Sequence, residues 1–284
     1  MDSRATAILR VSLGLALVLA ANACNGARCY SQESAGSASK DDDRGKRLEQ
    51  MKELARAFKV VAIAGNDRIP LKLAPEPLHR FTDPTRQKSD GVVWVWRLSG
   101  RPGALLVIEP EPKIWSFEFV SLSTGRVAAN NGTVRWEPTT AGVEFHEVPG
   151  AVAPAEGPVE RLRQIREITN RFSAREFWHV TGTNYPLRLL PHPIDRYSDA
   201  AGGVLDGAFF IFANATNPEV ILLIEARRHG KGVSKWHYAA ATLTTAAPTL
   251  LLDRKVVWSS SSKFGYLAGD PYFFGRWTRD QSEQ

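Results

Sequence analysis

The sequence predicts an α+β protein built as an internal duplication, in which each repeat has one N-terminal helix and an antiparallel sheet of about five strands. A shift of 116 residues places Pro70–Glu109 on Pro186–Glu225 without a gap, and 13 of the 40 positions are identical. Self-similarity of this kind is typical of repeated structural units. The central strands are apolar on both faces, and such strands are covered on both faces. We therefore expect the two sheets to pack together as a pseudo-dimer within one chain.

Composition places the chain among globular proteins with one large or two ordinary domains. Its 284 residues are 43% hydrophobic, with eight Trp and thirteen Phe, which is ample for packed cores. The net charge of +6 is spread along the chain rather than gathered in one basic block. We therefore expect no nucleic-acid partner, while an envelope polymer, a lipid or a protein partner stays open.

Residues 1–23 have the pattern of a signal peptide. Arg4 and Arg10 precede the apolar run Val11–Ala21, and Ala21-Asn22-Ala23 is a small-x-small cleavage site. The run is too short for a transmembrane helix, and no later segment is long enough. We expect a mature chain without a transmembrane span, exported to the periplasm or the extracellular space. An uncleaved N-terminal anchor is the alternative.

The two cysteines directly follow the cleavage site. Cys24 would be the acceptor of a lipid anchor, although Ala21 and Asn22 depart from the usual lipoprotein pattern, so lipid-anchored and free secreted forms both stay open. A Cys24–Cys29 disulfide is also open, and it would close only a small loop. Residues 24–46 are rich in Ser, Gly and charged residues, which predicts a flexible tether.

Each repeat is expected to begin with an amphipathic helix. Arg47–Phe58 and Arg161–Phe172 carry apolar residues at helical spacing, and Pro158 stands at a favoured first-turn position. Residues 148–158, rich in Pro, Gly and Ala, join repeat 1 (residues 47–147) to repeat 2 (residues 159–284).

Strands follow each helix. Short strands are expected at Val60–Ala64 and Phe177–Gly182, followed by proline-containing edge strands. Asp90-Gly91 and Asp206-Gly207 are typical turn dipeptides, and each precedes an apolar strand that forms a hairpin with the next one. Aromatic strands that start near Trp115 and Trp236 complete the pattern, and Trp136 and Trp258 lie in later strands.

Polar residues that both repeats keep are the candidates for chemistry. Glu109 and Glu225 each end an apolar run, and we expect each to pair with an arginine of its own repeat, Arg80 or Arg196. Asp206, which precedes a glycine, is expected in a turn, and Asp199 is expected to end a strand and cap a loop. A second hypothesis makes Glu225, Asp199 and Asp206 acid–base carboxylates gathered at one rim, as glycoside hydrolysis would need.

Ligand binding is the other candidate role. Arg196, Arg80, Glu109 and Trp236 are the candidate binding residues, although the alternation of the tryptophans favours a place in the core. No metal-binding spacing, phosphate loop or nucleophile motif occurs in the sequence, so we expect no metal and no cofactor.

A resemblance adds to this picture. The stretches LRLLPHPIDRY, LDGAFFIFANATNPEVILLIEARR and WHYAAATLT resemble segments of uncharacterised signal-peptide-bearing proteins of planctomycete-type bacteria. The resemblance covers roughly 80 residues of repeat 2 and implies no activity.

The sequence does not decide whether the protein is an enzyme. A duplicated sheet without a catalytic motif favours an exported, non-catalytic binding or interaction protein of the bacterial cell envelope. A hydrolase of an envelope polymer and a carrier of an apolar ligand between the two sheets are the alternatives.

Overall fold

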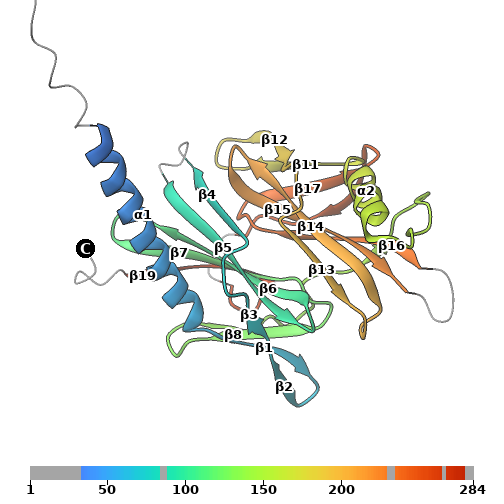
Figure 1. The fold of residues 1–284 in the computed structure, drawn as a ribbon, viewed down its shortest axis with the longest axis horizontal. Helices are drawn as coiled ribbons and strands as arrows, with labels where there is room; N and C mark the ends of the chain where they lie inside the picture. Colours follow the sequence, from blue (N-terminus) through green and yellow to red (C-terminus); the bar gives the residue numbers. More distant parts are fainter. Residues whose placement is uncertain (1–32, 84–87, 229–233, 264–266, 279–284) are drawn as a thin grey trace, which may run out of the picture. The chain divides into compact units, whose positions relative to one another are not determined.

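Antiparallel β-strands make up most of the protein, with two helices among the residues that the structure describes (Figure 1). The structure is a computed structural model and describes residues 33–83, 88–228, 234–263 and 267–278. The predicted signal peptide, Cys24 and Cys29 lie outside these residues. Residues 43–284 form one compact unit, to which the following description applies. No helix in the described ranges has the length and apolar character needed to cross a membrane.

The first half of the chain carries one helix and ten strands. They are α1 (Glu33–Arg56), β1 (Lys59–Ala64), β2 (Asp67–Pro70), β3 (Lys72–Leu73), β4 (His79–Asp83), β5 (Lys88–Leu98), β6 (Arg101–Pro110), β7 (Ile114–Ser121), β8 (Arg126–Asn130), β9 (Arg135–Trp136) and β10 (His146–Glu147).

The second half carries one helix and nine strands. They are α2 (Pro158–Thr169), β11 (Phe172–Trp178), β12 (Thr183–Leu189), β13 (Asp195–Asp199), β14 (Val204–Asn214), β15 (Asn217–Arg227), β16 (Lys235–Thr242), β17 (Ala247–Leu252), β18 (Lys255–Ser259) and β19 (Tyr272–Thr278).

Three antiparallel sheets result. The second half contributes most of a nine-stranded sheet in the order β10-β16-β15-β14-β12-β11-β17-β18, with β13 also paired to β14. The strands of the first half form two separate sheets. One has the order β19-β7-β6-β5-β3, with β4 paired to β5, and the other has the order β2-β1-β8-β9. The long expected hairpins, β5–β6 and β14–β15, are confirmed.

Strand pairing in the two halves follows the same register. Trp94 faces Leu106 between β5 and β6, and Phe210 faces Leu222 between β14 and β15, at the spacing of 116 residues. The pairs of β4 with β5 and of β13 with β14 match in the same way, irregularities included. Corresponding positions in the two halves can therefore be compared residue by residue.

The last strand of each half pairs with the sheet of the other half. In β10, His146 faces Tyr238 of β16, whereas in β19 Gly275 faces Phe117 of β7. Phe117 and Tyr238 are themselves in corresponding positions, so the two halves exchange strands in the same manner. This exchange fastens the halves to each other by backbone hydrogen bonds as well as by side-chain packing.

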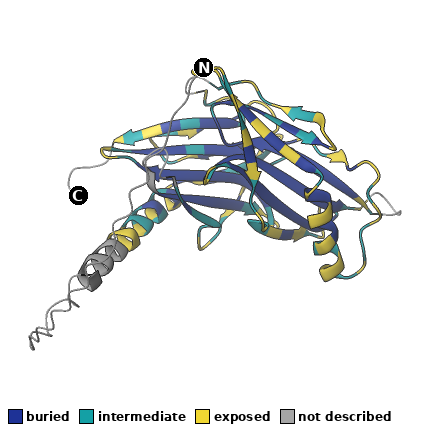
Figure 2. Cartoon of the chain, turned by 90° about the horizontal axis from the view of Figure 1, so that it is seen from above, coloured by how far each residue is buried: buried dark blue, intermediate teal, exposed yellow. Residues whose placement is uncertain are grey.

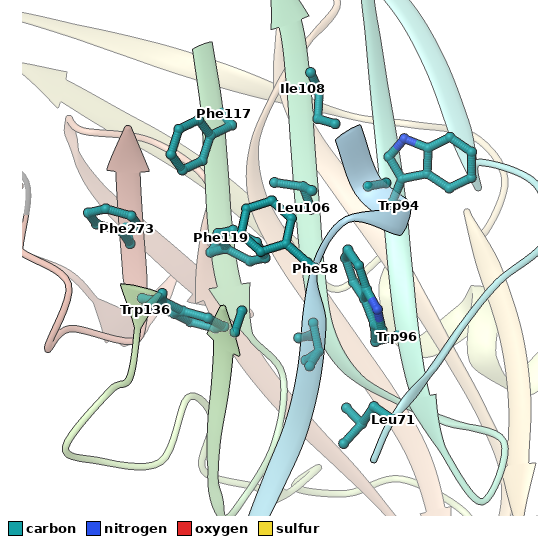
Figure 3. Packing of buried hydrophobic residues seen from close by; sticks show 14 of the residues in the cluster. Phe58, Leu71, Trp94, Trp96, Leu106, Ile108, Phe117, Phe119, Trp136 and Phe273 are labelled. Carbon is teal, nitrogen blue, oxygen red and sulfur yellow. The ribbon is translucent and has the colours of Figure 1, made fainter. Parts of the chain in front are cut away.

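The core has three layers of apolar side chains, and the central strands are buried along their length (Figure 2). One outer cluster joins α1 to β5, β6 and β7, where Phe58, Trp96, Leu106 and Phe119 face one another (Figure 3). A second joins α2 to β14, β15 and β16. The middle cluster contains the opposite faces of both sheets, and its members Val93 and Phe209 are fully buried. The prediction that these strands are covered on both faces is confirmed.

Both helices end earlier than the sequence pattern predicts. α1 ends at Arg56 and α2 at Thr169, so Phe58 and Phe172 lie beyond the helices rather than in them. Phe172 begins β11 and enters the core there, which also places this strand before the predicted Phe177–Gly182. Phe58 and Phe172 continue the helical spacing of apolar residues in the sequence, but they pack into the core from beyond the helix ends. Pro158 is confirmed in the first turn of α2.

α1 begins at Glu33, inside the segment expected as a flexible tether. Half of residues 33–44 are charged, and Ser, Asp and Gly, which have lower helix propensity than Ala, make up seven of the twelve, so propensity does not account for this part of the helix. Composition alone therefore did not distinguish a polar helix from a tether here.

Candidate functional site

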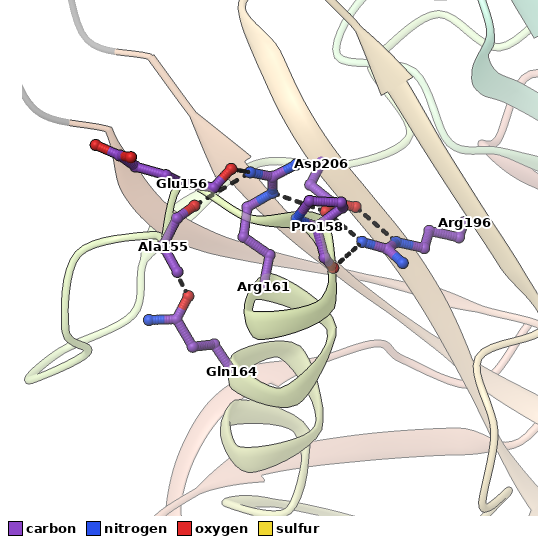
Figure 4. A network of polar contacts seen from close by, with 7 residues as sticks. All are labelled: Ala155, Glu156, Pro158, Arg161, Gln164, Arg196 and Asp206. Atoms are coloured by element: carbon purple, nitrogen blue, oxygen red, sulfur yellow. Dashed lines mark hydrogen bonds and ion pairs between the residues drawn. The ribbon is translucent and has the colours of Figure 1, made fainter.

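A buried aspartate ties α2 to its sheet. Asp206 accepts hydrogen bonds from Arg196, with Nε–Oδ1 at 2.9 Å and Nη2–Oδ2 at 2.6 Å, and from Nε of Arg161 on α2 at 2.8 Å (Figure 4). Arg196 also donates to the carbonyl oxygen of Pro158 at the helix start. The hydrogen bond to Asp206 raises the pKa of the Arg196 guanidinium. These contacts fix where the helix starts on the sheet.

The first half has the same arrangement. Arg80 donates to both carboxylate oxygens of Asp90 and to the carbonyl oxygen of Arg44, and Arg47 of α1 lies 3.4 Å from Asp90. The expected pairing of Arg80 and Arg196 with the glutamates is therefore wrong. These arginines point to the helix side of each sheet, where the aspartates are.

The two Asp-Gly dipeptides lie inside strands β5 and β14, not in turns, which corrects the sequence prediction. The glycine is needed for a different reason. A Cβ atom on Gly207 would lie 2.5 Å from the ring of Tyr197, and one on Gly91 would lie 2.6 Å from the ring of Phe81. Each glycine allows an aromatic ring of the neighbouring strand to lie directly on the backbone.

Glu225 lies on the other side of its sheet, fully buried, and its partner comes from the other half. Arg101 donates from Nε to Oε1 at 2.8 Å and from Nη2 to Oε2 at 3.0 Å, and the hydroxyl of Tyr197 donates to Oε1 at 2.8 Å. Burial raises the pKa of Glu225, and Arg101 and Tyr197 oppose that rise. Burial and the nearby Glu225 carboxylate raise the pKa of Tyr197 well above its ordinary value.

An aromatic ring completes this Glu225 site. The guanidinium carbon of Arg101 lies 5.0 Å from the ring centre of Phe145, and that of Arg227 lies 4.7 Å from it. Arg227 also approaches Glu225 at 3.6 Å. Two guanidinium groups are therefore held between one carboxylate and one ring, in a cation–π arrangement.

The structure does not gather the predicted acid–base carboxylates. Asp206 faces α2, whereas Glu225 lies between Ile224 and Ala226, which face the α2 side, and so faces the middle cluster. Asp199 is the last residue of β13 and accepts a hydrogen bond from the backbone N–H of Gly202 in the loop that follows, as expected for a residue that ends a strand and caps a loop. Trp236 is buried in the core beside α2.

A pocket of about 520 Å³ lies where the two halves meet. Its walls come from β6, β7, β11, β12, the β14–β15 turn, the β16–β17 loop and β19. Thirteen residues line it, namely Glu109, Glu118, Glu176, Trp178, Tyr185, Asn214, Asn217, Glu219, Leu243, Thr244, Thr245, Phe274 and Arg276. Glu109 alone among the sequence-predicted binding residues lines this pocket. Its volume falls within the range of roughly 300–1,000 Å³ that is usual for small-molecule sites.

Neutral donors orient the pocket carboxylates. Asn214 donates to Oε1 of Glu176 at 2.8 Å, and Asn217 donates to Oε1 of Glu219 at 2.8 Å. The hydroxyl of Ser116 lies 3.4 Å from Oε2 of Glu109. Amides and hydroxyls stabilise a carboxylate by hydrogen bonding without cancelling its charge.

Tyr272 shows how closely three of these carboxylates gather. Burial raises the pKa of its phenol well above the ordinary value, and Glu118, Glu219 and Glu109 raise it further. Only carboxylates that lie close to one phenol have this effect on it. Glu118, Glu219 and Glu109 therefore lie near the Tyr272 hydroxyl.

The pocket is the counterpart of the Glu225 site. By strand register, Glu109 corresponds to Glu225, Asn217 corresponds to Arg101, and Phe274 corresponds to Phe145. The remaining correspondences replace Tyr197 by Phe81 and Arg227 by Glu111. In one location Arg101 pairs with the glutamate, and in the other a pocket of about 520 Å³ lies beside the corresponding glutamate.

Most pocket carboxylates have no acidic counterpart. Strand pairing matches Glu118 with Ala239, Glu176 with Ala62, and Glu219 with Gly103. Sequence reasoning missed them because it selected the polar residues that the two halves share. The signal was in the positions where one half has a glutamate and the corresponding residue of the other half is an alanine or a glycine.

The fold and this pocket define a β-rich protein with a small-molecule-sized site at the junction of two similar halves. Comparison of the chain with protein-family models, with curated proteins and with solved structures gives no significant match. Within the described ranges, no group of three or more His, Cys, Asp or Glu side chains is arranged to hold a metal ion.

Proposed function

We propose that the protein is an exported, non-catalytic binding protein of the bacterial cell envelope, and that the pocket at the junction of the halves holds a small polar ligand. The observation that carries this proposal is the pocket of about 520 Å³ with carboxylates, amides and aromatic rings on its walls. Pockets that combine apolar walls with a few oriented polar groups are the usual form of a ligand site.

An internal duplication supports this reading of the pocket, and we include it in the proposal. The equal registers of β4–β6 and β13–β15, one helix on each sheet, and the exchanged strands β10 and β19 all fit two copies of one ancestral unit. After a duplication, one copy of a site can keep a structural ion pair while the other acquires a new role.

The space between the sheets is less suited to a ligand than the pocket. Val95, Leu105, Ile221 and Leu223 are all fully buried in the middle cluster, where the two sheets pack against each other. A carrier of an apolar ligand would need these side chains to separate, which would expose apolar surface to water. The pocket, in contrast, is already open.

Export rests on residues 1–23, whose charged start, apolar run and small-x-small site are typical of a signal peptide. The resemblance to signal-peptide-bearing proteins of planctomycete-type bacteria supports the same location. Fractionation of cells that express the full-length chain tests this part, and a chain that stays in the cytoplasm with residues 1–23 attached would contradict it.

A blocking variant tests the binding role. Thr245 is a half-buried residue of the pocket wall, and Thr245→Trp would fill much of the space without removing a carboxylate. Thermal-shift screening of the wild-type protein against a library of cationic, neutral and anionic metabolites should yield ligands that no longer shift Thr245→Trp. A library without any ligand, or ligands that bind both proteins equally, would contradict the proposal.

A further inference from the structure

We infer that the outer face of the sheet β2-β1-β8-β9 binds an acidic polysaccharide through its arginine and lysine side chains. This sheet lies at the bottom of Figure 1. The inference concerns a different surface from the pocket at the junction of the halves and goes beyond the proposed function. It rests on the charge of this face, on the spread of its cations and on a pocket that lies among them.

One side of the sheet belongs to the core and the other side carries charge. Val60, Val127 and Trp136 are buried in the outer cluster that α1 covers. Side chains alternate along a strand, so the residues between these face the opposite side. The charged residues on that side are exposed or half-buried and form what we call the basic face, namely Lys59 of β1, Arg68 of β2, Arg126 of β8, Arg135 of β9 and Glu137 directly after β9.

Three guanidinium groups of the basic face share one carboxylate. Arg135 donates to Oε2 of Glu137 at 2.7 Å, and Arg68 donates to Oε1 at 3.3 Å. Arg126 lies 3.6 Å from the same Oε1. The hydrogen bond from Arg135 and the charge of Arg68 lower the pKa of Glu137, which therefore stays ionised. With Lys59, the face carries four cations against this one carboxylate, so its net charge is positive.

The corresponding positions of the second half are neutral. Strand register places Ser173 at the position of Lys59, Asn184 at that of Arg68, Ala247 at that of Arg126, Val256 at that of Arg135 and Ser259 at that of Glu137. The same sheet face thus forms in the second half without these charges. The fold does not require the four cations, which favours a role for them in binding.

A pocket of about 350 Å³ lies on the basic face. Its charged lining residues are Lys59, Arg68, Arg135 and Glu137, and its apolar ones include Val61 and Ala128. Neighbouring strands are about 4.8 Å apart, so cations on four strands are spread over about 14 Å. A chain that carries a carboxylate on each sugar can contact several of them at once, and linked contacts strengthen one another.

The residues of this pocket favour a polysaccharide over other anionic partners. Val61 is half-buried and Ala128 is buried, whereas a face that enters a bilayer presents exposed apolar side chains. Aromatic side chains stack on the bases of single-stranded nucleic acids and anchor most protein partners, and none of the described lining residues is aromatic. Arginine side chains bind carboxylates through paired N–H donors.

Titration calorimetry with a matched pair of glycans tests the inference. Hexagalacturonate has a carboxylate on every sugar, and its methyl ester is the neutral form of the same chain. The wild-type protein should bind hexagalacturonate at least roughly tenfold more tightly than the ester, because several ion pairs form at once. Digalacturonate, which cannot span the face, should bind more weakly than hexagalacturonate. Raising the salt concentration should weaken binding.

Two double variants locate the site. Arg68→Gln with Arg135→Gln removes two exposed cations of the basic face and should weaken binding of hexagalacturonate about tenfold. Arg163→Gln with Arg175→Gln makes the same change of net charge at exposed residues of α2 and β11 and should leave binding unchanged. Glu137→Gln removes the carboxylate that the arginines share and should strengthen binding. Circular dichroism confirms that each variant is folded before titration.

Equal affinity for hexagalacturonate and its ester, or equal losses in the two double variants, would overturn the inference. Tighter binding of phosphatidylglycerol vesicles, single-stranded DNA or poly-L-glutamate, lost in Arg68→Gln with Arg135→Gln, would assign the face to another class of partner and overturn it as well. Thr245→Trp should bind hexagalacturonate as the wild-type protein does. A loss of binding in that variant would place the glycan in the junction pocket and contradict the role of the basic face.

Discussion

The Glu225 site and the pocket lie at corresponding places in two halves of one chain, but they differ in the residue that stands beside the glutamate. Both are built where a glutamate at the end of a central strand meets a residue at the start of a strand from the other half. In the Glu225 site that residue is Arg101, and the carboxylate is closed off by an ion pair. In the pocket it is Asn217, and space remains.

The difference lies in which groups surround the carboxylate at each of the two places. A buried carboxylate is tolerated when a partner charge and hydrogen bonds compensate its desolvation. Arg101 and Tyr197 supply this compensation to Glu225 from within the chain. Glu176 and Glu219 of the pocket are also buried, and the amides of Asn214 and Asn217 donate hydrogen bonds to them.

Removal of the Arg101 guanidinium should have the largest effect. Arg101→Met leaves Glu225 buried without its main counter-charge, and we expect a loss of about 3–5 kcal/mol of unfolding free energy at pH 7. The double variant Arg101→Met, Glu225→Leu should recover most of the loss, because no buried charge remains. Urea denaturation measures both, and a double variant as unstable as the single one would contradict this explanation.

The loss in Arg101→Met should depend on pH with a defined sign. Arg101 lowers the pKa of Glu225, so its removal raises the folded-state value further above the ordinary 4.5. A carboxyl with a raised folded-state pKa contributes stability below its unfolded-state pKa and loses it as pH rises through the folded-state value. The variant should therefore approach wild-type stability near pH 4 and fall behind between pH 4.5 and 7.

The two close glycines should behave alike, because both halves share that feature. Gly207→Ala and Gly91→Ala would each press a methyl group against an aromatic ring, at 2.5 and 2.6 Å in the present geometry. We expect each to lower the unfolding free energy by about 2–3 kcal/mol. Thermal unfolding of both variants checks this, and a neutral outcome at either position would mean that the ring can move away.

Tyr197→Phe makes the Glu225 site resemble the pocket side, where Phe81 occupies the same position. Loss of the hydroxyl that donates to Glu225 at 2.8 Å should lower stability by about 1–2 kcal/mol. The reverse change, Phe81→Tyr, should have little effect. Denaturation curves that show equal losses for the two changes would remove the distinction between the sites.

The two long hairpins and the doubly covered faces could be predicted from the sequence, because apolar alternation and the internal match indicate them. The division of the first half between two sheets and the strands β10 and β19 on the opposite half were not predicted, since one sheet of about five strands was expected in each repeat. Val93 and Phe209 are buried as their pattern indicates. The ends of helices were less predictable, since Phe58 and Phe172 fit a helical spacing and a strand equally well. Asp-Gly was misread because a close aromatic ring on Gly91 or Gly207 is a tertiary contact with no local signal.

The candidate site could be predicted only in part. Glu109 stood out because it is matched by Glu225, but a residue that both halves share need not have the same role in each. Glu118, Glu176 and Glu219 come from three different strands, and their meeting point depends on how the halves cross. Comparison of the positions that differ between the halves would have found them, as the exchange of Arg101 for Asn217 illustrates.

One measurement tests most directly whether the pocket binds a ligand, namely a thermal-shift comparison of the wild-type protein with Thr245→Trp, whose side chain would fill the pocket. The account predicts that a small polar ligand raises the melting temperature of the wild-type protein and leaves that of Thr245→Trp unchanged. A ligand that shifts both proteins equally, or a library without any ligand, would contradict the account.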